Sequence, residues 1–227
     1  MRRGRHGHGR EAREGLVEGR ARGAARRAPH ARGTVRASAR QGDSAGTPAV
    51  YVGLGNGHDI FTGGSVEALT GGVIKLGDGR DTISITSLTG VSAISLFGDN
   101  GSNANSDLID LSTQTGMNGF VLKGRGGNDT ISVSGLQASS LVQGNDGADS
   151  IALSGGVDGL AAGVEVGGGK GDDTIFMETT SGAYAASVSG DIFGGAGNDT
   201  FSLNNLTNGL VDLGAEVKWA SCNIFST

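Results

Sequence analysis

From residue 47 onward, apolar residues recur at fixed positions around a series of seven aspartates. An apolar residue follows each aspartate by two positions, and another follows by four positions in every copy except the first, which has Gly63. A spacing of two is the period of a β-strand, whose alternate side chains lie on one face. A third apolar residue lies seven positions before each aspartate, or eleven in the longer third copy, where it is Leu96. The aspartates are Asp59, Asp81, Asp107, Asp129, Asp149, Asp173 and Asp199.

Successive aspartates are separated by 22, 26, 22, 20, 24 and 26 residues. A repeat near this length is typical of a solenoid, in which each repeat forms one coil stacked on the next. The pattern inside a repeat predicts a strand, a Gly- and Asp-rich turn, a second strand and a second loop without a motif. We therefore expect an all-β fold, a parallel β-roll or β-helix solenoid of about seven coils, with the acidic turns along one edge.

Each aspartate closes a six-residue turn, such as LGNGHD at 54–59 or GGAGND at 194–199. Glycine permits positive φ angles and a close approach of backbone carbonyls to an ion. Stacking brings successive carboxylates within about 5 Å of one another, where they repel unless a cation neutralises them. Ca²⁺ is the expected cation, because it takes six to eight carboxylate and carbonyl oxygens. The expected calcium ligands are Asp59, Asp81, Asp129, Asp149, Asp173 and Asp199, with the turn residues Gly55, Gly57, Gly77, Gly79, Gly124, Gly127, Gly144, Gly147, Gly169, Gly171, Gly195 and Gly197.

Asp107 is left out of this set, because its turn, SNANSD, lacks glycine and carries an insertion. An alternative interpretation stays open, in which the turns bind no metal and Gly, Asn and Asp simply favour tight chain reversals. Mg²⁺ fits less well, because it demands a stricter octahedron. Zn²⁺ is disfavoured, because His58 is the one histidine after residue 45 and Cys222 lies outside the repeats.

The turns resemble the hemolysin-type (RTX) calcium-binding repeat, G-G-x-G-x-D-x-U-x. Residues 168–175 and 194–201 match this pattern in full, and the resemblance covers about residues 50–213. The usual repeat of that family has nine residues, whereas here the turn recurs every 20–26 residues. This long period is similar to that of β-strand-repeat proteins of bacterial surfaces. The resemblance implies a calcium-bound, secreted or cell-surface bacterial protein of the kind exported by type I secretion.

Charge divides the chain into two parts. Residues 1–45 carry 12 Arg against four acidic residues, whereas the remainder carries 6 Lys and Arg against 19 acidic residues. We expect three regions: a disordered Arg-rich tail over 1–47, the calcium-binding repeats over 48–214, and a C-terminal tail or truncated end over 215–227. For the Arg-rich tail, three interpretations stay open: an artefact of an upstream start codon or of cloning, a solvated leader, or a basic arm. The unusual end of the repeats favours a fragment of a longer array.

The sequence shows no constellation typical of catalysis. His58 occupies a variable turn position, and Cys222 has no nearby histidine. We therefore expect no enzymatic activity, and a calcium-binding structural module that folds on Ca²⁺ binding, with a spacer or adhesive role. The alternative is an accessory repeat of an exported protease, lipase or polysaccharide-modifying enzyme. Expected partners are calcium ions and either cell-surface polysaccharide or further repeats, with no nucleic acid and no membrane span.

Overall fold

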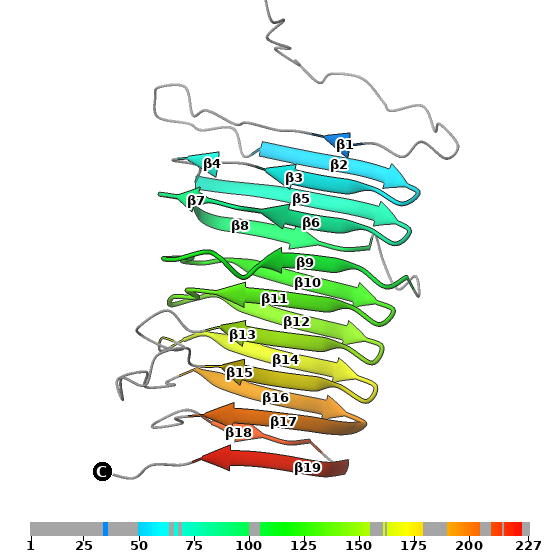
Figure 1. Cartoon of the computed structure of the whole chain (residues 1–227), viewed down its shortest axis with the longest axis vertical. Helices are drawn as coiled ribbons and strands as arrows, with labels where there is room; N and C mark the ends of the chain where they lie inside the picture. The colour runs from blue at the N-terminus through cyan, green and yellow to red at the C-terminus, as the bar shows by residue number, and fades with distance from the viewer. Residues whose placement is uncertain are drawn as a thin grey trace, which may run out of the picture.

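The computed structural model describes residues 34–35, 50–63, 66–67, 70–99, 105–154, 161, 163–178, 190–204, 210–214 and 216–223. These residues form β-strands, turns and loops, and none of the described segments is a helix that would cross a membrane. The strands stack along one axis into a column, with β1 and β2 at one end and β19 at the other (Figure 1).

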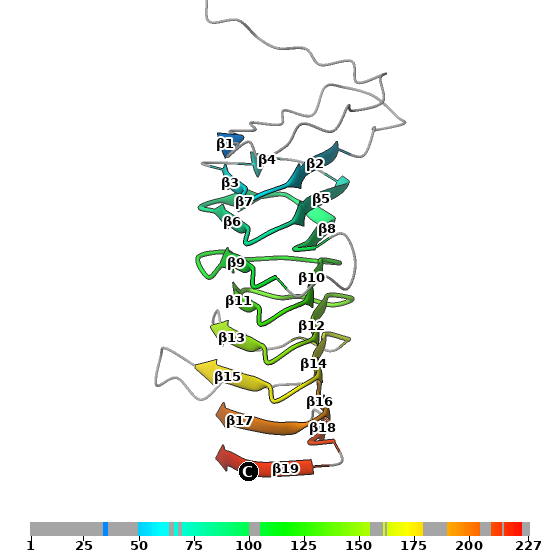
Figure 2. The ribbon, with the colours of Figure 1, turned by 90° about the vertical axis from the view of Figure 1, so that its right-hand side faces the viewer.

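Two parallel sheets form the walls of this column and face each other (Figure 2). The nine-stranded sheet contains, in spatial order, β1 (Thr34–Val35), β3 (Ile60–Gly63), β6 (Thr82–Ile85), β9 (Leu108–Leu111), β11 (Thr130–Ser134), β13 (Ser150–Ser154), β15 (Thr174–Glu178), β17 (Asn198–Asn204) and β19 (Glu216–Asn223). The eight-stranded sheet contains β2 (Val50–Asn56), β5 (Thr70–Asp78), β8 (Ser92–Phe97), β10 (Val121–Gly126), β12 (Leu141–Asp146), β14 (Glu165–Lys170), β16 (Asp191–Ala196) and β18 (Val211–Asp212). A two-stranded sheet pairs β4 (Val66–Glu67) with β7 (Leu88–Thr89) at the opposite edge from the acidic turns. The predicted all-β parallel solenoid is confirmed.

The register of the strands follows the apolar columns of the sequence. Ile131 pairs with Ile151, which pairs in turn with Ile175, and each of these side chains is fully buried. On the facing sheet, Leu122 and Val142 pair in the same way. Because the pairing is parallel and in register, each inner column becomes a continuous apolar ladder between the two sheets.

The interior also extends to the edge opposite the acidic turns, where the second loops lie. Met117 and Phe120, in the connection between β9 and β10, are at most 1% exposed, and Leu136 and Val164 are buried in the following coils. A hydrogen bond joins two neighbouring coils at this edge, because the Ser134 hydroxyl donates to the Gln114 carbonyl oxygen. These loops carry no repeated motif, so no sequence pattern predicted that they contribute to the core.

The nine-stranded sheet ends in β1 on one side and in β19 on the other. β19 pairs in parallel with β17, with a register shift between Asp199 and Thr200, so residues 216–223 extend the sheet rather than form a separate tail. At the other end, Thr34–Val35 pair with β3 as β1. The remainder of the Arg-rich segment and residues 224–227 lie outside the described residues.

Candidate metal-binding edge

The motif aspartates form one buried column along the edge where the eight-stranded sheet turns into the nine-stranded sheet. Each of the seven side chains is at most 3% exposed. In each neighbouring pair, the backbone N–H of one aspartate donates a hydrogen bond to the Oδ1 atom of the aspartate in the next coil. The six N–H to Oδ1 distances are 2.6 Å for Asp59 to Asp81, 2.8 Å for Asp81 to Asp107, 2.8 Å for Asp107 to Asp129, 2.7 Å for Asp129 to Asp149, 2.8 Å for Asp149 to Asp173 and 2.9 Å for Asp173 to Asp199. We call this column the aspartate ladder.

The glycines of the turns leave room for backbone atoms of the neighbouring coil. Gly77 and Gly79 have φ angles of 116° and 140°, which side-chain-bearing residues rarely adopt. A Cβ atom on Gly77 would lie 1.6 Å from the Gly55 carbonyl oxygen, and one on Gly79 would lie 1.7 Å from the Gly57 carbonyl oxygen. The carbonyls of one turn therefore point along the stack at the glycines of the next, so the glycine pattern follows from stacking.

The first position of the last four turns, which is Gly124, Gly144, Gly168 or Gly194, has a different role, because it faces the carboxylate of its own coil. A Cβ on Gly124 would lie 2.1 Å from Asp129 Oδ2, and one on Gly168 would lie 2.3 Å from Asp173 Oδ2. The Gly168 position also lies 2.7 Å from the Gly194 carbonyl oxygen of the next coil. A carboxylate oxygen and a carbonyl oxygen thus border the same small space, into which a side chain would intrude.

Six Oδ2 atoms of the aspartate ladder, from Asp81 to Asp199, are buried without a hydrogen-bond partner. Burial of an unpaired carboxylate disfavours its charged form. Desolvation accordingly raises the pKa of Asp129 to about 8 and the pKa values of Asp107 and Asp173 to about 7. The hydrogen bond that each Oδ1 accepts partly offsets this rise. From Asp81 to Asp199, the ladder therefore lines one edge with carboxyl groups that each have one buried oxygen outside any hydrogen bond.

The third turn, whose sequence is degenerate, also contributes its aspartate to the ladder. Asp107 occupies the same buried place in the ladder as the other aspartates. A further carboxylate, Asp99, follows β8, is 0% exposed and has both oxygens without a hydrogen bond of regular geometry. Burial raises the pKa of Asp99 to about 6, and the neighbouring Asn105 partly offsets this. The register of the seven aspartates identified Asp107 as a repeat member, whereas nothing in the repeat pattern pointed to Asp99.

A second set of hydrogen bonds runs along the outside of the same edge, from the residues that precede each aspartate. Here the acceptor lies on the earlier coil: the backbone N–H of Arg80 donates to His58 Nδ1 over 3.2 Å, and that of Ala148 donates to Asn128 Oδ1 over 3.0 Å. Asp172 is exposed and accepts from the N–H of Asn198 over 2.8 Å. We call this set the outer ladder.

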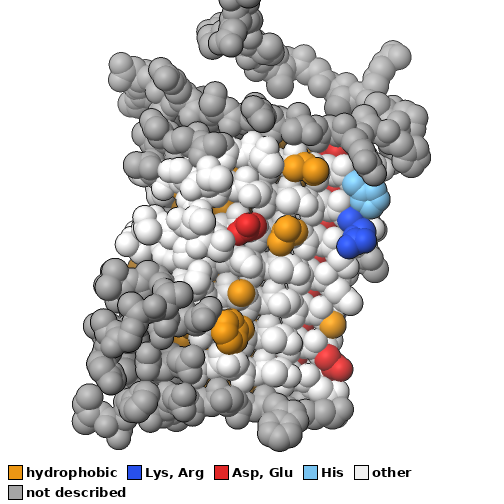
Figure 3. Space-filling view, in the orientation of Figure 1, with side chains coloured by type: hydrophobic (Ala, Val, Ile, Leu, Met, Phe, Trp, Pro, Cys, Tyr) orange, Lys and Arg blue, Asp and Glu red, His pale blue; other side chains and the backbone are white. Residues whose placement is uncertain are grey.

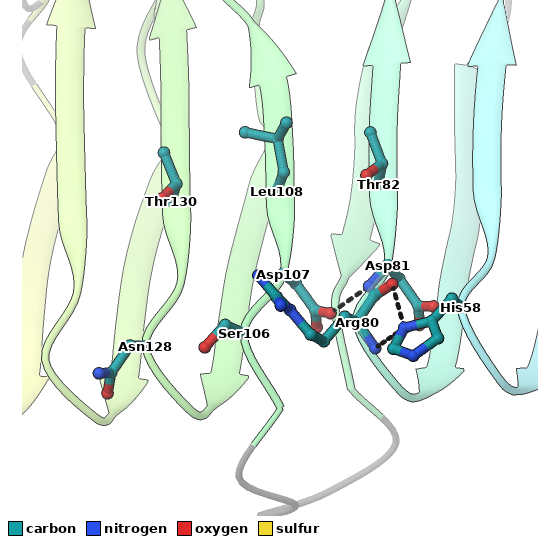
Figure 4. A pocket seen from close by; sticks show the side chains of 9 residues that line it. All are labelled: His58, Arg80, Asp81, Thr82, Ser106, Asp107, Leu108, Asn128 and Thr130. Carbon is teal, nitrogen blue, oxygen red and sulfur yellow. Dashed lines mark hydrogen bonds between the residues drawn. The ribbon is translucent and has the colours of Figure 1, made fainter.

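An open depression of about 600 Å³ lies beside the first turns (Figure 4). In Figure 4, His58, Arg80, Ser106 and Asn128 follow one another along the turns, and the buried Asp81 and Asp107 lie behind them. The depression is lined by His58, Arg80, Asp81, Thr82, Ser106, Asp107, Leu108, Asn128 and Thr130.

The chemistry that this edge offers is a supply of hard oxygen atoms. No group of three acidic, imidazole or thiol side chains converges on one point in the part of the chain that the structure describes. A cation at the edge would therefore take one or two carboxylate oxygens and fill its remaining positions from turn carbonyls or water. That mixture suits Ca²⁺, which accepts irregular geometry and both kinds of oxygen.

Comparison with known proteins gives one family match. Residues 192–227 match the family model of S-adenosyl-L-homocysteine hydrolase, a segment well under half of the chain. Its described residues form β16, β17, β18 and β19 of the solenoid. No curated protein and no solved structure matches the chain significantly.

This match corrects three predictions from the sequence. Membership of the hemolysin-type family was predicted from the turn motif, and that prediction was wrong, because the match is to a different family. The expectation of a hemolysin-type, type I-secreted bacterial protein falls with it. The prediction that the chain is not an enzyme is contradicted by the same match, since S-adenosyl-L-homocysteine hydrolase is an enzyme. In this chain the glycines are required by the close contact between coils and the aspartates by the ladder, so the turn motif also reflects stacking.

Proposed function

We propose that this chain is a calcium-binding structural solenoid whose coils are held together at one edge by bound Ca²⁺, with a spacer or adhesive role. The observation that carries the proposal is the column of buried Oδ2 atoms without hydrogen-bond partners. Leaving such oxygens charged and unpaired is costly, and a cation beside them removes that cost. The carboxylates of the aspartate ladder, together with turn carbonyls such as that of Gly194, would hold the ions.

The competing explanation is a metal-free ladder whose carboxyl groups are protonated. The raised pKa values of Asp107, Asp129 and Asp173 are compatible with it near neutral pH. The two explanations differ in what Ca²⁺ does, because an ion that binds only the folded chain stabilises it, whereas a protonated ladder gains nothing from the ion.

Calcium titration of the metal-free full chain, followed by circular dichroism and isothermal calorimetry, tests the proposal. We expect β-structure and melting temperature to rise with Ca²⁺, and Mg²⁺ to substitute poorly. Asp173→Ala should reduce the bound calcium and the rise in melting temperature, while the matched variant Asp172→Ala, which changes the exposed neighbour, should leave both nearly unchanged. Equal spectra and equal melting temperatures in chelator and in Ca²⁺ would reject the proposal.

The family match supports a second candidate function, hydrolysis of S-adenosyl-L-homocysteine. Incubation of the chain with this compound, followed by chromatography for adenosine and homocysteine, tests it. Release of both products would assign the activity, and absence of turnover would remove this candidate. An extracellular location, and surface polysaccharide or further repeats as partners, stay predictions.

A further inference from the structure

The outer side of the eight-stranded sheet separates its charges along the column. Lys75, Lys123 and Arg125 project from β5 and β10, and each is partly exposed. Further along the same face, Glu165, Asp191 and Asp212 project from β14, β16 and β18, and all three are exposed. By contrast, among the residues that the structure describes on the outer side of the nine-stranded sheet, Lys and Arg side chains lie near the edge that bears the acidic turns (Figure 3). We call the outer side of β5 to β18 the divided face.

The basic half of the divided face is organised around an aromatic ring. The Arg125 Cζ atom lies 4.4 Å from the centre of the Phe97 ring, and Lys75 Nζ lies 5.7 Å from it. Such cation–π contacts hold the charged groups against the sheet. Arg125 also has a φ angle of 89° at the position where Gly77 and Gly169 occupy other coils. Its backbone is thus held in a conformation that residues other than glycine rarely adopt.

One column of side chains on this face has a special order. If the column is reversed about its middle residue, in β12, its basic first residue comes opposite its acidic last residue and its two aromatic residues come opposite each other. By direct pairing, the column runs Lys75, Phe97, Lys123, Gln143, Gly167, Phe193, Asp212. Reversing the order of the strands about Gln143 places Lys75 opposite Asp212 and Phe97 opposite Phe193. In the same reversal β10 lies opposite β14, so Lys123 comes opposite Gly167, two residues along the strand from Glu165, and Arg125 comes opposite Gly169.

We propose that two copies of this chain pack through their divided faces, related by a two-fold axis that runs along β12 in the plane of the interface. Such an isologous contact uses the same patch twice, so every pairing above occurs twice. The two Phe97–Phe193 contacts form its apolar part, and half-buried Val73, Val121 and Leu141 of the adjacent column add to it. The charge pairs fix the antiparallel order, because a parallel order would place like charges opposite each other.

The size of the divided face suits a reversible dimer. Seven strands at about 4.8 Å spacing extend about 30 Å, and six residues of strand extend about 20 Å. The face then covers about 600 Å² on each copy, which is at the lower limit for specific interfaces. We therefore expect concentration-dependent pairing that weakens as salt screens the charges.

Charge-reversal variants of the full chain test the proposal by analytical ultracentrifugation over a wide concentration range. The wild type should shift from one-chain to two-chain mass as its concentration rises. Lys75→Glu and Asp212→Lys should each reduce dimer formation at least tenfold, and the double variant should restore it, because the opposed charges are exchanged. Lys170→Glu, an exposed residue paired with Asp146 at the turn edge, is the matched control and should dimerise like the wild type.

Circular dichroism of each sample shows whether a variant that no longer dimerises is still folded. Because the spectra are recorded both in Ca²⁺ and in chelator, the outcome for the dimer does not depend on whether the chain binds calcium. If a charge-reversal variant lost its β-structure, Lys75→Ala, which removes attraction without adding repulsion, would replace it and should weaken the dimer. A folded wild type with one-chain mass at all concentrations would overturn the proposal. Failure of the double variant to restore the dimer, or growth of the wild type beyond two chains, would also overturn it.

Discussion

At the scale of single residues, Asp129 shows how the aspartate ladder balances charge against hydrogen bonding. Its Oδ1 accepts the N–H of Asp107, while its buried Oδ2 has no partner and the pKa is raised to about 8. Asp129→Asn keeps an oxygen acceptor and removes the charge. We expect the variant to melt higher than the wild type in chelator at about pH 9, where the wild-type carboxyl is ionised, and to gain less from Ca²⁺.

Differential scanning calorimetry in chelator and in Ca²⁺ measures both effects of Asp129→Asn. The matched control is Asp146→Asn, which makes the same change of charge at an exposed turn residue. A variant that responded to Ca²⁺ as strongly as the wild type would show that Asp129 does not bind the ion.

The glycines provide a steric test of the same edge. A Cβ on Gly144 would lie 2.1 Å from Asp149 Oδ2, whereas one on Gly167 would find its nearest neighbour, Gln143 Cγ, at 3.9 Å. Gly144→Ala should therefore displace the carboxylate and lower the free energy of unfolding by about 1–3 kcal/mol, in the range typical of overpacking. Gly167→Ala should change it by less than about 1 kcal/mol. Urea denaturation of the two variants measures the difference, and equal losses would contradict the assigned role of Gly144.

Sequence reasoning identified the residues whose types repeat and missed those that do not. The aspartate register is visible because stacking requires the same group at the same height in every coil. Asp99 lies in the one turn with an insertion, so no periodic pattern marks it. Met117 and Phe120 are buried by a connection that differs from coil to coil, and only the fold shows where that connection lies.

At the scale of the element, the ladder predicts an unusual dependence of stability on pH. The ordinary pKa of these carboxyls is 3.8, and folding raises the values to between about 6 and about 8. A raised pKa in the folded chain means that folding favours the protonated form. In chelator, burial of the ladder therefore does not reduce the free energy of unfolding at pH values below the ordinary pKa. The free energy of unfolding falls as pH rises through the pKa values of the folded chain.

Thermal melts in chelator, between about pH 5 and about pH 9, should accordingly show a melting temperature that falls as pH rises. In saturating Ca²⁺ the slope should become flat or reverse, because the ion binds the ionised carboxylates and protons compete with it. A melting temperature in chelator that rises with pH across this interval would show that the ladder does not carry the desolvation cost assigned to it.

At the scale of the whole molecule, the acidic body predicts a response to salt. Residues 46–227 carry 6 basic and 19 acidic residues, so the metal-free column repels itself. We expect sodium chloride to raise the melting temperature in chelator, since ions at physiological strength screen charges beyond about 8 Å. In Ca²⁺ the increase should be smaller, because bound ions already neutralise part of the charge. If sodium chloride raised the melting temperature equally in chelator and in Ca²⁺, residues 46–227 would not bind calcium.

The opposed directions of the aspartate ladder and the outer ladder have a consequence for how this chain can evolve. In the first, each coil offers an acceptor to the coil before it, and in the second an acceptor to the coil after it. The aspartate ladder repeats its contact at all six junctions, whereas the outer ladder forms at three of them, His58–Arg80, Asn128–Ala148 and Asp172–Asn198. A gene segment that encodes one coil can be duplicated or deleted in frame, and the flanking coils meet the same aspartate-ladder partners across the new junction. Column length is thus a trait that recombination can change in steps of 20–26 residues while the aspartate-ladder contact is kept.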